Sequence, residues 1–113
     1  MRRPPVEVPI ETIAGQVGRL FGLHPAALQG QGRSREAAQA RAVVAYLGRE
    51  EAGLSLKTAA RYFHRDAATL SVAVQRLETR MAGDPQLAAR VTSLRRVIRR
   101  GARPKRHKQI IKA

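Results

Sequence analysis

Several residue types are absent or scarce, and each absence narrows the range of functions. The sequence has no cysteine and no tryptophan, and its only aromatic residues are two phenylalanines and two tyrosines. Without cysteine there is no disulfide scaffold and no thiolate metal site, and the chain suits a reducing compartment. The three histidines (His24, His64 and His107) lack the usual ligand spacings, so we expect no metal and no cofactor. No apolar run is long enough to cross a membrane, and no apolar segment follows the basic N-terminus, so we expect no secretory signal.

Acidic residues are also scarce. The chain has 8 Asp and Glu against 22 Lys and Arg, which gives a formal net charge of +14 over 113 residues. The excess lies in the second half, because residues 52–100 carry ten bases and three acids, and residues 101–113 carry five bases and no acid. This balance indicates a polyanionic partner, for which we favour nucleic acid over an acidic protein or a membrane surface.

Apolar residues recur at helical spacing along most of the chain. The pattern predicts helices near residues 10–21, 25–28, 35–52, 56–63, 67–82 and 85–100. No segment alternates apolar and polar residues as a half-buried strand does. The prediction is therefore an all-α fold of about five to six helices, in which residues 1–9 form an extended arm, residues 10–100 form the domain and residues 101–113 form a basic tail.

Residues that suit helix ends stand at these boundaries. Ser34, Ser55 and Asp66 are good N-caps, because their side-chain oxygens can accept from free backbone N–H groups. Gly22 and Gly53 suit helix ends, because glycine adopts the left-handed conformation without strain. Gly83, Asp84 and Pro85 together suit a stop, a cap and a first helical position.

Residues 55–80 have the layout of a helix-turn-helix, with a short helix, a tight turn and a longer helix. Ala59 and Ala60 are small enough to let the two helices approach closely. His64 stands in the turn where glycine is common. The alternative for the same pattern is an ordinary helical hairpin within a bundle.

If this hairpin binds a major groove, its second helix presents its N-terminal turn first. Thr69 and Ser71 can hydrogen-bond phosphate or a base edge, Ala67 and Ala68 offer only apolar contact, and Gln75 can read an adenine. Basic side chains around this helix would contact the phosphates of the DNA backbone. The candidate DNA-binding residues of this element are Lys57, Arg65, Asp66, Ala67, Ala68, Thr69, Ser71, Gln75 and Arg76.

Two further basic features flank the hairpin. A glycine-containing loop carries Arg33 and Arg35, with Arg41 following in the next helix, and such a loop suits an adjacent minor groove. The alternative is a solvated helix start. The last helix and the tail hold Arg95, Arg96, Arg99 and Arg100 and then five more bases. These residues suit either a non-specific phosphate clamp or a solvated surface.

Four stretches together resemble a known family: IETIAGQVGRLFGL at 10–23, RSREAAQAR at 33–41, LSLKTAARYF at 54–63 and RDAATLSVAVQRLE at 65–78. Through them, residues 10–100 resemble the C-terminal DNA-binding domain of the bacterial replication initiator DnaA. The resemblance implies a TrpR-like helical architecture that binds double-stranded DNA as a monomer rather than as a homodimer. It also implies that Arg33 or Arg35 stands for the family's minor-groove arginine.

The sequence departs from the family at its most diagnostic motif. The family pattern at the start of the recognition helix is Arg-Asp-His-Thr-Thr-Val, and here residues 65–70 read Arg-Asp-Ala-Ala-Thr-Leu. The resemblance implies that the His and first Thr contact bases, and both are alanine in this chain. We therefore expect sequence-specific DNA binding at a site other than the family's own DnaA box. The family's ATPase motor has no counterpart here, because no phosphate-binding Gly-rich loop with Lys-Ser/Thr is present.

The variant of residues 65–78 also resembles the initiator-type domain at the C-terminus of REP-associated tyrosine transposases. Those proteins carry a His-hydrophobic-His metal motif, which this chain lacks. Tyr46 and Tyr62 lie on expected helices, where packing explains them. We predict no enzyme activity, no small-molecule substrate and a location with the nucleoid in the cytoplasm. The alternatives that remain open are an RNA-binding or non-specific nucleic-acid-binding basic protein and a protein-interaction module.

Overall fold

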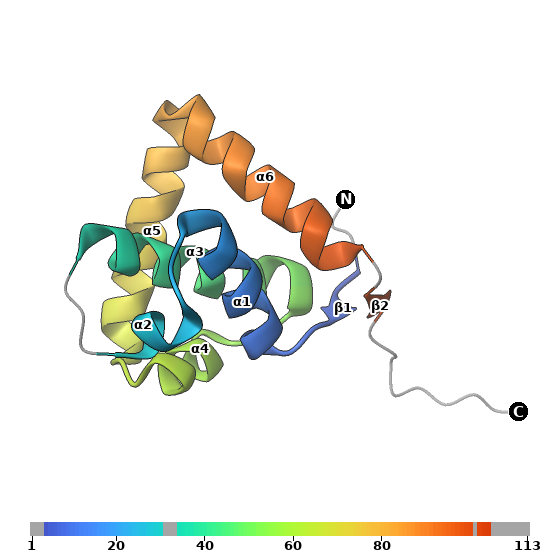
Figure 1. Ribbon diagram of the computed structural model, residues 1–113, viewed down its shortest axis with the longest axis horizontal. Helices are drawn as coiled ribbons and strands as arrows, with labels where there is room; N and C mark the ends of the chain where they lie inside the picture. Colours follow the sequence, from blue (N-terminus) through green and yellow to red (C-terminus); the bar gives the residue numbers. More distant parts are fainter. Residues whose placement is uncertain (1–3, 31–33, 101, 105–113) are drawn as a thin grey trace, which may run out of the picture.

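The computed structural model describes residues 4–30, 34–100 and 102–104. Across these residues it contains six helices and one small sheet (Figure 1): β1 (Val6–Glu7), α1 (Ile10–Phe21), α2 (Pro25–Gln29), α3 (Arg35–Ala52), α4 (Leu56–Phe63), α5 (Ala67–Gly83), α6 (Pro85–Arg99) and β2 (Arg103–Pro104). The expected all-α fold is confirmed. Each expected helix is present, and only Gly83 differs in role, because it closes α5 from inside the helix instead of following it.

α3 is the central helix of the domain. It packs against α1, α2, α4, α5 and α6. The five residues of its expected inward stripe are all buried: Ala37, Ala40, Val43, Val44 and Leu47. The burial extends further than the stripe, because every residue from 40 to 48 is buried. A helix that has neighbours on all sides no longer shows a polar face, so the sequence pattern understated this burial.

The expected helix caps are formed as the residue types predict. Ser34 Oγ accepts from Ala37 N at 3.0 Å, and Asp84 Oδ1 accepts from Gln86 N and Leu87 N at 3.1 Å each. Gly22 and Gly53 both adopt the left-handed conformation, with φ of 70° and 66°. These contacts satisfy backbone groups that would otherwise lack partners at helix ends.

Gly18 is a structural residue that the sequence pattern did not single out. Leu23 N donates to Gly18 O at 2.7 Å, which closes the end of α1. A Cβ atom at position 18 would clash with the carbonyl oxygen of Leu23. Because that oxygen belongs to the backbone, the turn into α2 depends on a residue without a side chain.

The two ends of the described chain meet in a short antiparallel ladder, in which Val6 pairs with Pro104 and Glu7 with Arg103. Val6 and Val8 are both buried against the helices. Val6 and Val8 therefore belong to the core, which the expectation of a simple extended arm did not include. A strand of two residues is too short to show an alternating pattern, so the sequence carried no signal for it.

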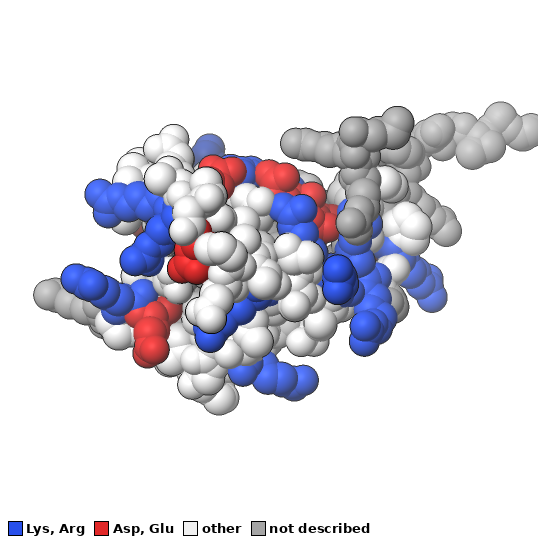
Figure 2. Space-filling view, turned by 90° about the horizontal axis from the view of Figure 1, so that it is seen from above, with Lys and Arg blue, Asp and Glu red and all other residues white. Residues whose placement is uncertain are grey.

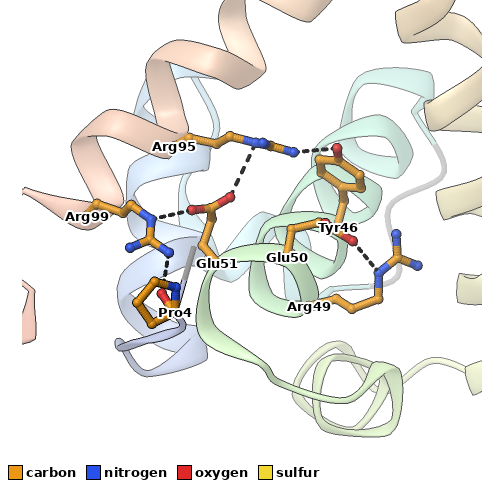
Figure 3. A network of polar contacts seen from close by, with 7 residues as sticks. All are labelled: Pro4, Tyr46, Arg49, Glu50, Glu51, Arg95 and Arg99. Atoms are coloured by element: carbon orange, nitrogen blue, oxygen red, sulfur yellow. Dashed lines mark hydrogen bonds and ion pairs between the residues drawn. The ribbon is translucent and has the colours of Figure 1, made fainter. Parts of the chain in front are cut away.

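A buried acid joins α3 to α6 and to the segment before β1 (Figure 3). Glu51 is 4% exposed, and its Oε1 accepts from Arg99 Nε at 2.6 Å while its Oε2 lies 3.4 Å from Arg95 Nε. Arg95 also donates to the Tyr46 hydroxyl at 2.6 Å, and Arg99 donates to the carbonyl oxygen of Pro4. The two arginines are therefore occupied by intramolecular partners.

Candidate nucleic-acid interface

α4 and α5 form the expected hairpin, joined by residues 64–66. Ser55 Oγ accepts from Thr58 N at 3.2 Å and begins α4. Ala59, Ala60 and Phe63 face α5 and the core, and all three are buried. The small alanines permit the close packing of α4 against α5, and the buried Phe63 fixes the end of α4 to the core.

His64 gives the turn its tight geometry. Its φ and ψ are 55° and 45°, the left-handed conformation that a glycine adopts without strain. Its N–H donates to Arg61 O, and the N–H of Arg65 donates to Ala60 O at 2.9 Å. The turn therefore keeps the geometry of a glycine-ended helix, although the residue is histidine.

Replacing His64 with glycine is expected to raise the free energy of unfolding by about 0.5–1 kcal/mol, because the strain of a left-handed side chain exceeds the extra entropy of glycine in the unfolded chain. Thermal or urea unfolding measures this gain. His64→Ala keeps the strain and should show no gain. A glycine variant less stable than the parent would contradict the interpretation of the turn.

The N-terminal turn of α5 is exposed and well ordered by its cap. Asp66 Oδ2 accepts from Thr69 N at 3.1 Å, which fixes the expected N-cap. Leu70, Val74 and Leu77 are buried, so Ala68, Val72 and Gln75 point outward as helical spacing predicts. Thr69 is exposed, and Ala67 and Ser71 are half-buried. Val72 is 46% exposed, so this helix presents a large apolar side chain at its surface.

A groove of about 700 Å³ separates the first turns of α3 from the outer face of α5. Ala38, Ala42, Val72, Ala73 and Leu77 give it an apolar floor. Polar and basic side chains complete its lining: Arg35, Gln39, Gln75, Arg76, Thr79 and Arg80. The structure thus brings Arg35 and Arg76 to one groove. Gln39 and Arg80 were missed by the sequence reasoning, although the four-residue spacing of Arg76 and Arg80 places them on one helix face.

Arg41 does not lie on the surface where the sequence analysis expected it. It is 7% exposed, and its Nη1 donates to the carbonyl oxygen of Leu28 at 3.2 Å. Burial lowers the pKa of the Arg41 guanidinium from its ordinary value, and the nearby charge of Arg65 lowers this pKa further. The physical reason for the inward position is that the last carbonyl groups of α2 lack helical partners and take an arginine instead.

Arg65 has a similar structural role. Its Nη2 donates to Gly30 O at 2.8 Å and its Nη1 to Phe63 O at 2.9 Å. Gln29 Nε2 adds a bond to Tyr62 O at 2.9 Å. These contacts tie the end of α2, and hence the start of the basic loop, to the turn of the hairpin. Arg41 and Arg65 thus both contact the protein backbone, Arg41 from inside the domain and Arg65 from a half-buried position, and contact of either residue with DNA phosphates stays a prediction.

Of the remaining candidates, four are exposed basic or polar residues and one lies outside the described residues. Lys57 is exposed on α4, and Arg35, Gln75 and Arg76 are exposed beside the groove. Arg33 lies outside the described residues, so the basic loop is represented by its last residues alone. Within the described ranges, no group of three or more His, Asp or Glu side chains could hold a metal ion. The helices of those same ranges include none that is long and apolar enough to cross a membrane.

Comparison with known proteins places this arrangement in a family. Residues 10–77 match the family model described as the bacterial DnaA protein helix-turn-helix. The chain is 35% identical over 89 residues to the chromosomal replication initiator protein DnaA of Deinococcus radiodurans, which covers 79% of this chain and 19% of that protein. It is 34% identical over 94 residues to DnaA of Deinococcus deserti, which covers 81% of this chain and 21% of that protein.

The match begins at the start of α1 and ends at the buried Leu77 of α5, so it contains all of α4, the turn and α5 as far as Leu77. The chain spans about a fifth of the length of these relatives. What it shares with them is a helix-turn-helix module and not a catalytic domain. By these sequence matches, the chain belongs to the bacterial DnaA helix-turn-helix family.

Proposed function

We propose that the chain binds double-stranded DNA sequence-specifically, with the N-terminal half of α5 in the major groove and the start of α3 at the adjacent minor groove. The observation that carries the proposal is the shared groove. Arg35 of α3 and Arg76 of α5 line it from opposite sides, next to the exposed N-terminal turn of α5. An α-helix fits the major groove, and arginine is favoured in a narrow minor groove.

The surface of α5 suggests how bases would be read. Thr69 can donate to or accept from a base edge, and Gln75 can pair with adenine. Ala68 and Val72 offer exposed apolar surface that suits the methyl group of thymine. Since alanines occupy positions 67 and 68, the polar readers of the family's own DnaA box are missing. We therefore infer a recognition sequence that differs from that box.

The groove between α3 and α5 also supports the two-groove arrangement. The DNA strand that separates a major groove from the neighbouring minor groove must run between the protein elements that enter the two grooves. On this chain, that DNA strand would run over the small side chains of Ala38 and Ala42, with arginines on both sides. Arg35, Arg76 and Arg80 could then contact successive phosphates. Binding of this kind needs one copy of the chain, so we propose a monomeric reader located at the nucleoid.

The experiment that tests the proposal is selection of bound sequences from a random duplex pool, followed by titration at salt concentrations from 50 to 200 mM. One enriched sequence with a steep loss of affinity as salt rises is the expected result. Enrichment of the DnaA box would contradict the altered specificity. Equal or tighter binding of duplex RNA at the same salt would replace the proposal by RNA binding.

Two substitutions test the contacts within this site. Thr69→Ala and Arg35→Ala are each expected to weaken binding to the enriched sequence by about 1–3 kcal/mol. Thr69→Ala should act on the enriched sequence alone, whereas Arg35→Ala should also lower the salt dependence. Thr12→Ala and Arg19→Ala are matched controls, because both residues are exposed on α1 and neither lines the groove. Unchanged affinity in both test variants would overturn the docking arrangement.

A further inference from the structure

The outer side of α6 is a basic surface that the proposed function does not use. Arg96 and Arg100 lie one turn apart on it, and Ala89, Thr92 and Ser93 precede them on the same side of the helix. All five side chains are exposed. We call these five residues the α6 face. After the N-cap Asp84, α6 contains no acidic residue.

The charge of this face is not compensated within the described residues. Like charges four residues apart destabilise a helix, and two such pairs lie at the end of α6 and its C-cap: Arg95 with Arg99, and Arg96 with Arg100. Glu51 compensates the first pair by direct contact. No carboxylate of the described chain lies within ion-pair distance of Arg96 or Arg100, although Glu7 lines a cleft together with Arg100.

An ordinary solvated helix face intersperses acids among its bases. The α6 face differs from this pattern. An acidic residue at position 92 or 93 would reduce the repulsion between the arginines, but α6 has hydroxyl residues at both positions. The helix dipole favours cations at this end and offsets part of the repulsion. A bound anion would relieve the rest of the repulsion between the arginines.

The side chains of the α6 face suit the phosphates of a duplex. Serine, threonine and arginine are donors that commonly contact DNA phosphates, and an alanine allows the backbone to approach the helix. From Ala89 to Arg100 the face extends about 16 Å along the helix. This length corresponds to about five nucleotides of one strand. A single small anion would occupy only part of such a face.

The α6 face lies away from the hairpin. In Figure 1, α4 and the beginning of α5 lie at the lower left, whereas the end of α6 lies at the right beside β1 and β2. Figure 2, seen from above that view, shows basic side chains at the right-hand end of the molecule as well as at its left-hand end. α1 and α3 lie between the two sites. DNA on the α6 face would therefore be a different segment from the one on α5.

We propose that the α6 face binds the phosphates of a second DNA duplex segment without reading its sequence, so that one chain bridges two segments. This inference rests on the proposed binding of a first duplex by α4 and α5. The expected complex contains one chain and two duplexes, and its formation is more salt-dependent than the binding of a single duplex.

The test uses the full chain and two short duplexes. One duplex carries the enriched sequence and is immobilised, and the other has an unrelated sequence and a fluorescent label. The wild-type chain should capture the labelled duplex. The variant R96A/R100A should lower this capture by about tenfold and change the affinity for the first duplex by less than about threefold. R19A/R90A removes the same charge outside the α6 face and should leave the capture unchanged.

Each other outcome identifies what has failed. Capture that persists in R96A/R100A, or that falls equally in R19A/R90A, would overturn the α6 face as the second site. Sedimentation showing two chains per bridged pair would overturn bridging by one chain. A wild type that binds the first duplex but captures no second one would overturn this inference alone, whereas failure to bind the first duplex would overturn the proposed function.

Discussion

Replacing Glu51 with alanine is expected to lower the free energy of unfolding by about 3–5 kcal/mol, as removal of one partner from a buried ion pair generally does. Glu51 has a side chain only 6% exposed, and it faces Arg99 and Arg95, whose side chains are 17% and 33% exposed. Without the carboxylate, two positive charges that repel each other stay at the junction of α3 and α6. Urea unfolding at constant protein concentration measures the loss.

The neighbouring Glu50 provides a matched control for this prediction. It lies on the same helix and pairs with Arg49 at 3.0 Å, but both side chains are much more accessible to water. Glu50→Ala should therefore cost no more than about 1 kcal/mol, as is usual for a pair near the surface. Equal effects of the two substitutions would show that burial of Glu51 does not decide the stability of this junction.

Replacing Phe63 with alanine is expected to cost about 3–5 kcal/mol of stability, through lost burial and the cavity left behind. Phe63 is 0% exposed and lies at the end of α4, where its ring meets that of Tyr62 edge to face at 5.0 Å between centroids. α4 is only eight residues long, and Phe63 is its largest fully buried side chain. Thermal unfolding monitored by circular dichroism measures the loss.

The same variant should also lose DNA affinity at temperatures where it remains folded, since α4 supports α5 and carries Lys57. Phe63→Leu fills most of the volume and should lie between the parent and Phe63→Ala in both measurements. If Phe63→Ala cost less than about 1 kcal/mol, the packing of α4 against the core would be weaker than the structure indicates.

Local chemistry explains why so much of the fold could be predicted. Ser34, Ser55 and Asp66 cap helices because each needs only a backbone N–H two or three residues ahead. The left-handed conformation of His64 was indicated by its place in the turn. Leu87, Val91, Leu94 and Ile98 are buried as the helical period of α6 predicted. In all these cases the deciding interactions lie within a few residues along the chain.

The features that the sequence did not reveal share the opposite property. Arg41 bonds a carbonyl 13 residues away, and Arg65 bonds one 35 residues away. A surface arginine and an arginine that caps a distant helix have the same appearance in a sequence. The pairing of β1 with β2 and the contacts of Glu51 are equally distant in the chain. The periodicity of one segment contains no information about which backbone oxygen or arginine will lie opposite.

The sequence was enough to predict which residues belong to the candidate site, but not how they are arranged in space. The sequence pointed to Arg35, Thr69, Gln75 and Arg76, and the structure places these residues at the surface around the hairpin and its groove. The groove itself required knowledge of how α3 and α5 pack. The resemblance of the recognition segment to transposase-associated domains and the identity of the DNA sequence stay predictions, which the selection experiment addresses.

The junction of the two chain ends has a consequence for the order of folding. Each helix contacts the next one along the chain, and such local contacts form quickly. The bond from Arg99 to Pro4 instead joins residues 95 positions apart, and β1 reaches β2 across a similar separation. Closing so long a loop costs chain entropy before any contact compensates for it, so the junction should form last. It should also open first, which makes residues 4–9 and 102–104 the least protected against local unfolding while the α4–α5 hairpin stays intact.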